Sequence, residues 1–261
     1  MEEEFGETDY TDLTVLAVDE ISIRRGHSYM TVVLDYLTGR VIWMGVARRA
    51  DTLMKFFDGM TKEQKEHLQA IVMDMWDPFI KAVQDRVPHV KIVFDLFHMV
   101  KEFHKVIDRV RIDEYNKASE SNKSVIKGSK YLLLKNSENI KNGEEQEHLD
   151  RLLALNETIS EVMILKDKLK MIWECDSRQE AKRQIDEWCS LAKAVHHPSV
   201  DTFAKRIRRY EYGILNHCDY PIHTSILEGV NNKIKVIKRK SYGFHDERYF
   251  SLKVIQAFST N

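Results

Sequence analysis

Four acidic residues stand where a carboxylate could hold a metal ion. Asp19 follows the apolar run LAV, Asp74 follows IVM and Asp95 follows KIVF, so each comes near the end of a segment with the composition of a buried strand. Ends of central strands are where open sheets expose functional side chains. The fourth acid is Glu228, just ahead of the densest basic run, which holds Lys233, Lys235, Lys238, Arg239 and Lys240. Acids that hold a metal, beside bases that hold phosphate, are the mixture that a nuclease-type site needs.

A simpler interpretation of each feature stays open at this point. A strand-end aspartate can cap the following helix or pair with a lysine, because a buried carboxylate needs a cation, a donor or a metal in any case. A basic run can be the solvated C-terminal end of a helix, where Lys and Arg are common.

The composition indicates a folded protein and excludes a simple polycation. The chain has 261 residues, of which 43% are hydrophobic and 10% aromatic, and its 40 Lys+Arg against 41 Asp+Glu give a net charge of -1. This length allows one large domain or two ordinary ones. Nucleic-acid binding remains compatible with a balanced charge, because it depends on where the basic residues lie.

The spacing of the cysteines and the composition of the first residues indicate the cellular compartment in which the protein is expected. Cys175, Cys189 and Cys218 form no CxxC pair, so a zinc ribbon and a disulfide framework are not expected, and reduced thiols fit a cytosolic protein. The acidic start MEEEFGETDY lacks the layout of a secretory signal. No apolar stretch approaches the roughly 20 residues that span a bilayer. We expect a cytoplasmic protein without a membrane partner.

The first hundred residues read as strands followed by alternating helices and strands. Short turns join the first three strands, which predicts an antiparallel meander, and the later strands alternate with helices, which predicts a mixed sheet covered by helices. The expected strands are Leu13–Ile23, Ser28–Tyr36, Arg40–Arg48, Gln69–Met75 and Val90–Phe97. Helices are expected after Asp51 and from Asp77 to Val87.

The middle of the chain is predicted to be helical. Apolar residues recur at three-to-four spacing from Met99 to about Tyr212, and only Ser119–Ser129 and Asn136–Glu145 read as loops. We therefore expect three parts: residues 1–98 with the sheet and first helices, a helical insertion at 99–212, and a C-terminal catalytic helix region at 213–261 that completes the first part.

Five motifs occur in an order that carries a family resemblance. They are VDE at Val18–Glu20, SYMTVVLD, VMDMWDPF at Val72–Phe79, VFDLFHMVK and LEGVNNKIKVIKRKSYGF. Together they resemble the catalytic domain of DDE transposases of the ISL-three type, from bacterial insertion sequences, over nearly the whole chain. The closing motif is the most specific of the five.

The resemblance implies an α/β, RNase H-like fold: a mixed five-stranded sheet flanked by helices, with a large all-helical insertion before the last catalytic glutamate. Carried over position by position, it makes Asp19, Asp74 and Glu228 the catalytic and metal-holding triad. Asp95 and His98 resemble an Asp-x-x-His element, which we interpret as a positioning feature.

The chemistry of such a site explains the choice of residues. Cutting a phosphodiester, or joining a 3′-OH to a new strand, is an in-line displacement that two hard cations can assist. Mg²⁺ prefers oxygen ligands, and Mn²⁺ can substitute for it. Because the displacement uses one cation at the attacking oxygen and one at the leaving oxygen, we expect two such ions. If residues 226–239 are helical, Glu228 shares one face with three side chains that could touch phosphate: Asn231, Asn232 and Lys235. Lys238, Arg239 and Lys240 would extend this DNA-binding surface.

The leading hypothesis is a transposase catalytic domain that performs metal-dependent DNA strand cleavage and strand transfer, associated with the bacterial nucleoid. Members of the family usually carry zinc-ribbon and helix-turn-helix segments ahead of this domain. The catalytic pattern here starts within the first twenty residues, so the end-recognition segments are expected to be lacking. Expected partners are insertion-sequence ends and target DNA, and the family suggests a homodimer. One alternative is a truncated, non-catalytic remnant that binds DNA or a full-length transposase through its helical block; another is an RNase H-like nuclease with a different substrate.

Overall fold

The computed structural model of the chain describes residues 10–24, 28–140, 142–222, 225–240, 244 and 246–259. The chain divides into two compact units. The first combines the residues up to Asp95 with those from Tyr220 onward, and the second is formed by Leu96–Asp219. Each unit is described separately below.

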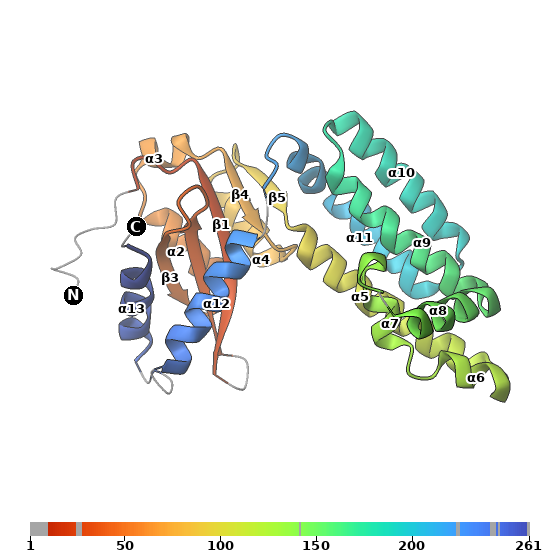
Figure 1. Ribbon diagram of the computed structural model, residues 1–261. Helices are drawn as coiled ribbons and strands as arrows, with labels where there is room; N and C mark the ends of the chain where they lie inside the picture. The colour runs from red at the N-terminus through yellow and green to blue at the C-terminus, as the bar shows by residue number, and fades with distance from the viewer. Residues whose placement is uncertain are drawn as a thin grey trace. The chain divides into compact units, whose positions relative to one another are not determined.

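A mixed five-stranded sheet is the centre of the first unit (Figure 1). Its strand order is β3-β2-β1-β4-β5, with the first three strands antiparallel and β1, β4 and β5 mutually parallel. The strands are β1 (Val15–Arg24), β2 (Ser28–Asp35), β3 (Val41–Val46), β4 (Ala70–Met73) and β5 (Lys91–Phe94). The predicted α/β class, the meander and the mixed sheet of RNase H-like type are confirmed.

Helices cover both faces of this sheet, which explains why its central strands are apolar on both sides. Alternate residues of a strand point to opposite faces. Val15, Ala17 and Ile21 of β1 share a core with Val230 and Ile234 of one covering helix. The helices of the unit are α2 (Ala50–Asp58), α3 (Lys62–His67), α4 (Asp77–Arg86), α12 (Ser225–Lys240) and α13 (Glu247–Ser259). Figure 1 shows α12 and α13 on one face, with α2 and α4 on the other.

The second unit is entirely helical among its described residues. Its core includes the fully buried Trp188, whose indole Nε1 donates a hydrogen bond of 2.8 Å to the Leu165 carbonyl and whose ring packs against Phe103 and Phe203. The α-helices are α5 (Leu96–Lys117), α6 (Glu120–Ile126), α7 (Lys130–Leu134), α8 (Gly143–Leu155), α9 (Glu157–Met171), α10 (Arg178–Ala194) and α11 (Pro198–Leu215). Short 3-10 turns are η1 (Ser137–Asn139), η2 (Ile172–Glu174) and η3 (Asn216–Cys218).

Two sequence-based expectations about single elements are wrong. The segment Ser119–Ser129, predicted to be a loop, contains α6, in which Ile126 is the one buried residue and so gives no apolar periodicity. The fifth strand was predicted to reach Phe97, but β5 ends at Phe94 and α5 begins at Leu96. The apolar residues Leu96 and Phe97 therefore belong to a helix.

Two further findings concern the whole described chain. The three cysteines form no disulfide bond. None of the helices in the described part of the chain combines the length and the apolar character needed to cross a membrane.

Candidate active site

Asp19 and Asp74 come two residues after the same paired position of two neighbouring parallel strands. The pairing of β1 with β4 runs from Val15–Ala70 to Ala17–Val72; Asp74 lies just past the end of β4 at Met73, as predicted. β1 continues past Asp19 to Arg24, so Asp19 lies in the middle of its strand and not near its end as predicted. Since side chains alternate along a strand, Asp19 is on the face of Ala17, which packs in the core beneath α12. Asp19 is only 9% exposed, so its carboxylate needs polar partners.

A third side chain completes a group that could hold a metal ion. Asp19, Asp74 and His98 each offer one ligand atom, and these atoms lie within 4.8 Å of one another. His98 follows the end of β5 in the first turn of α5. Asp95, which was predicted together with His98, is buried at 4% exposure and is not in this group of atoms.

A hydrogen bond to Asp19 connects helix α12 to β1. The Asn231 side-chain amide donates to Asp19 Oδ2 over 2.5 Å, and the backbone N–H of Glu20 donates to Asp19 Oδ1 over 2.7 Å. Below this contact, Ile234 of α12 is completely buried in the core of the sheet. The segment was predicted to be helical, and the structure confirms it.

Glu228 is carried on the same helix, one turn before Asn231. A separation of three residues places the two side chains on one face, about 4.5 Å apart along the helix axis. Glu228 is exposed, and it does not belong to the group formed by Asp19, Asp74 and His98. Its role as the third acid stays a prediction.

Most of the predicted DNA-binding side chains lie on the outer surface of α12. Exposed residues of this set are Asn232, Lys235, Arg239 and Lys240. Lys238 is partly buried, because its ammonium group donates to the Ser22 carbonyl of β1 over 3.1 Å. Asn231 contacts Asp19 in the free protein, whereas the sequence pointed to phosphate as its partner.

A second group of side chains beside the acids was not predicted from the sequence. Arg48 forms an ion pair of 2.8 Å with Glu20, the neighbour of Asp19. Its guanidinium also lies 4.0 Å from the centre of the Trp76 ring, two residues after Asp74. Nothing in the sequence near Arg48 signalled these contacts.

Comparison with known proteins connects this geometry to a family. The family model DDE_Tnp_ISL3, described as Transposase, matches residues 16–254. The chain belongs to this transposase family. It is 37% identical over 258 residues to the transposase for insertion sequence element IS1001 of Bordetella parapertussis, covering 98% of this chain and 63% of that protein. It is 25% identical over 258 residues to the transposase for insertion sequence element IS1557 of Mycobacterium tuberculosis, covering 90% of this chain and 58% of that protein. The chain thus spans about 60% of the length of these curated relatives.

The side chains of this family member suit a divalent cation. Two carboxylates whose oxygens approach one another repel, and a shared cation offsets that repulsion. Carboxylate oxygens suit Mg²⁺ and Mn²⁺, while the imidazole of His98 is a ligand that softer divalent metals prefer. Asp19 and Asp74 therefore fit the metal that DDE transposases typically require.

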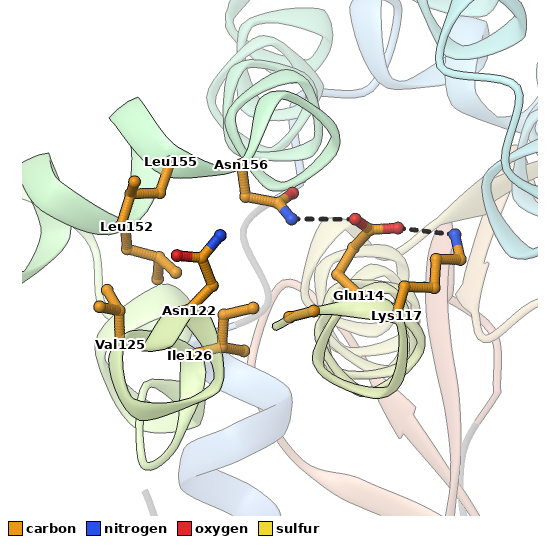
Figure 2. Close-up of a pocket in the computed structure, with 9 residues that line it drawn as sticks. Glu114, Lys117, Asn122, Val125, Ile126, Leu152, Leu155 and Asn156 are labelled. Atoms are coloured by element: carbon orange, nitrogen blue, oxygen red, sulfur yellow. Dashed lines mark hydrogen bonds and ion pairs between the residues drawn. The ribbon is translucent and has the colours of Figure 1, made fainter. Parts of the chain in front are cut away.

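A cavity in the helical unit of this family member is lined by polar groups that already pair with one another (Figure 2). It has a volume of about 120 Å³ and is lined by residues of α5, α6 and α8 together with Asn156. The Glu114 carboxylate there accepts hydrogen bonds from Lys117 over 2.7 Å and from Asn156 over 2.9 Å. Burial by itself would raise the pKa of Glu114, but these two donors bring that pKa below its usual value. Asn156 also caps α9 through its side-chain oxygen, so these polar groups are engaged in joining helices.

Proposed function

We propose that this chain is the catalytic part of a transposase that cleaves DNA strands and transfers them during DNA transposition. The observation that carries the proposal is the hydrogen bond between Asn231 and Asp19. It attaches the helix that bears Glu228 to β1, the strand that carries Asp19 and pairs in parallel with β4, just before Asp74. Family membership supports the same conclusion.

In this proposal Asp19, Asp74 and Glu228 hold two Mg²⁺ ions, for which Mn²⁺ can substitute. When bound, such ions activate the attacking oxygen and stabilise the leaving oxygen of an in-line displacement at phosphorus. The protein contributes a fixed orientation of the acids. Oδ1 of Asp19 accepts a hydrogen bond from the Glu20 N–H, and Oδ2 accepts one from Asn231; these bonds hold the carboxylate in a fixed orientation. His98 and the buried Asp95 are positioning residues of the same site.

The outer surface of α12 supplies the proposed contacts with DNA. Lys235, Arg239 and Lys240 are exposed there, and lysine and arginine neutralise phosphates without reading the base sequence. DNA binding by this surface is expected to weaken steeply with added salt. The proposed partners are the ends of an insertion sequence, target DNA, and a second copy of the chain.

The decisive experiment replaces Glu228 with glutamine and measures nicking of a supercoiled plasmid in Mg²⁺ or Mn²⁺. Glu66→Gln is the matched control, because Glu66 is an exposed glutamate on α3 of the same unit. Loss of a metal-holding carboxylate removes several kcal/mol of charge stabilisation, so nicking should fall at least about 100-fold. Folding, measured by circular dichroism, and plasmid binding, measured by gel shift, should match the control, since the Glu228 side chain is exposed.

Two outcomes would contradict the proposal. Equal nicking by Glu228→Gln and the control would remove Glu228 from the catalytic set. If the unaltered chain binds DNA but cleaves none in either metal, the non-catalytic alternative, binding through the helical block, takes precedence. That alternative is then tested by the salt dependence of DNA binding to the same chain.

A further inference from the structure

The backbone pairing that places Asp19 beside Asp74 stops before it reaches them. Among the described residues, β1 pairs with β4 only from Val15–Ala70 to Ala17–Val72. Beyond this point β1 continues to pair with β2, where Asp19 faces Val32, whereas β4 ends at Met73. The separation of the two acids therefore depends on contacts other than the β1–β4 ladder.

Arg48 supplies such a contact between β1 and the turn that follows β4. One of its terminal nitrogens lies 2.8 Å from Oε1 of Glu20, the residue after Asp19. Its guanidinium carbon lies 4.0 Å from the centre of the Trp76 ring, and the Trp76 backbone N–H donates to the Asp74 carbonyl over 2.7 Å. A cation over an indole face is attracted by the ring. Arg48 thus connects the residue beside one acid to the turn that contains the other.

Glu20 and Asp19 point to opposite faces of the sheet, because consecutive residues of a strand alternate. Asp19 is on the face covered by α12, so the ion pair between Glu20 and Arg48 is formed on the other face. Arg48 accordingly reaches the acids through Glu20 and Trp76. It is a positioning residue and not a metal ligand.

The backbone just before Arg48 is shaped for this contact. Ala47 has a φ of 83°, a conformation that alanine rarely adopts and that persists only when its surroundings hold it. Here the Ala47 N–H donates to the Tyr29 carbonyl over 2.8 Å, and the Ala47 carbonyl accepts from the Thr31 hydroxyl over 2.7 Å. These bonds from β2 fix the turn that directs Arg48 away from the line of β3.

The group formed by Glu20, Arg48 and Trp76 is not arranged for stability alone. The Nε of Arg48 and the Nε1 of Trp76 are both buried and lack a hydrogen-bond partner among the described residues. Unsatisfied buried donors are costly, so this group contributes less to stability than a fully paired one would. An ordinary ion pair of the same unit, between Arg86 and Asp58, is formed at the surface with two hydrogen bonds of 2.7 and 3.3 Å.

We propose that Arg48, through Glu20 and the Trp76 ring, sets the separation of Asp19 and Asp74 and thereby the affinity of their metal site. The inference rests on the proposed role of these two aspartates as metal ligands. It makes Arg48 and Trp76 determinants of metal binding that touch no metal.

The test is titration calorimetry with Mn²⁺ on the whole chain and on Arg48→Lys. Lysine keeps the charge but lacks the planar guanidinium, which can pair with Glu20 and stack on the Trp76 ring at the same time. We expect the Mn²⁺ affinity of Arg48→Lys to fall at least about tenfold, as when residues that orient metal ligands are changed. Arg86→Gln, which also breaks an ion pair of this unit, should bind Mn²⁺ like the unaltered chain.

A second pair of variants separates positioning from general destabilisation. Trp76→Phe keeps an aromatic face under the guanidinium and should retain most of the affinity, whereas Trp76→Leu should lose as much as Arg48→Lys. Hydrogen exchange at the Trp76 amide gives a readout that needs no metal. Exchange should be at least about tenfold faster in Arg48→Lys than in Arg86→Gln, because the turn opens locally.

Each result of the calorimetry and of the hydrogen exchange either supports or overturns the proposed role of Arg48. Equal Mn²⁺ affinity in Arg48→Lys and Arg86→Gln overturns the inference while leaving the proposed function intact. If the unaltered chain binds no Mn²⁺, the metal site of the proposed function fails in the free protein. Hydrogen exchange then decides the role of Arg48: faster exchange in Arg48→Lys supports the connection, and unchanged exchange refutes it.

Discussion

Lys166 of α9 should make the stability of the chain rise between neutral and alkaline pH. The residue is 3% exposed, and its ammonium group donates to the Leu133 carbonyl over 2.7 Å and to the Lys135 carbonyl at the end of α7. Burial lowers the pKa of Lys166 from 10.5 to about 8, and Lys170 adds to this effect while Asp167 opposes it. Burial therefore dominates, despite two carbonyls that favour the cation.

The size and sign of the effect follow from proton linkage. Below pH 8 Lys166 is protonated in the folded and the unfolded chain, so the folded state bears the full cost of the buried charge. Between about pH 8 and 10.5 the unfolded chain binds more protons, and stability therefore rises with pH. A pKa that falls from 10.5 to about 8 corresponds to about 3 kcal/mol over this window.

The assay is urea unfolding at pH 7.5, 9.0 and 10.5, followed by circular dichroism, on the unaltered chain and on Lys166→Met. Other groups also titrate in this range, so the informative quantity is the difference in unfolding free energy between the two proteins. That difference should rise by about 3 kcal/mol in favour of the unaltered chain. Lys193→Met, at an exposed lysine of α10 in the same unit, is the control. A difference that stays constant from pH 7.5 to 10.5 would refute the reasoning.

Two packing predictions test the elements that support the site and the helical unit. Ile234→Ala removes a completely buried side chain of α12 and should lower the unfolding free energy by about 2–5 kcal/mol, measured by urea unfolding. Val236→Ala, on the exposed side of the same helix, should change the unfolding free energy by no more than about 0.5 kcal/mol. Equal losses in the two variants would contradict this packing of α12 on the sheet. Trp188→Phe should cost about 1–3 kcal/mol by removing the buried hydrogen bond to the Leu165 carbonyl and part of a closely packed ring. Trp173→Phe should cost less, because the Trp173 indole nitrogen has no hydrogen-bond partner among the described residues, and the reverse order in thermal unfolding would show that the hydrogen bond is unimportant.

The sheet could be predicted from the sequence because its signals are local. Runs such as LTVLAV and QAIVM are apolar and β-branched. The polar residue after QAIVM marks the end of β4, whereas β1 continues through Asp19 and Glu20 to Arg24. Helix α6 was missed because one buried side chain, Ile126, gives no periodicity to detect. The end of β5 was placed too late because Leu96 and Phe97 continue its apolar run, and a periodicity argument cannot separate a strand from the first turn of a helix over so few residues.

The candidate site was predictable in part, because Asp19 and Asp74 each follow an apolar run. Asp74 does come directly after the end of β4, but Asp19 is in the middle of β1, which continues to Arg24. The contacts of Arg48 could not be expected, because they depend on the positive φ of Ala47, and alanine carries no signal for that conformation as glycine would. The hydrogen bond from Asn231 was equally hidden, because it joins residues that are 212 positions apart.

That long separation has a consequence for the order in which the protein is made. A chain emerging from the ribosome presents β1 to β5 early, but the apolar face that α12 and α13 cover must wait until residues 96–219 have been synthesised. Domains tend to fold as units during synthesis, so the helical unit can fold while that face of the sheet is still bare. Asp19 gains its Asn231 partner only after α12 has been synthesised. A nascent chain that has not yet reached α12 would thus expose an aggregation-prone sheet before it could assemble the carboxylates, and the synthesis of α12 controls when this site first exists.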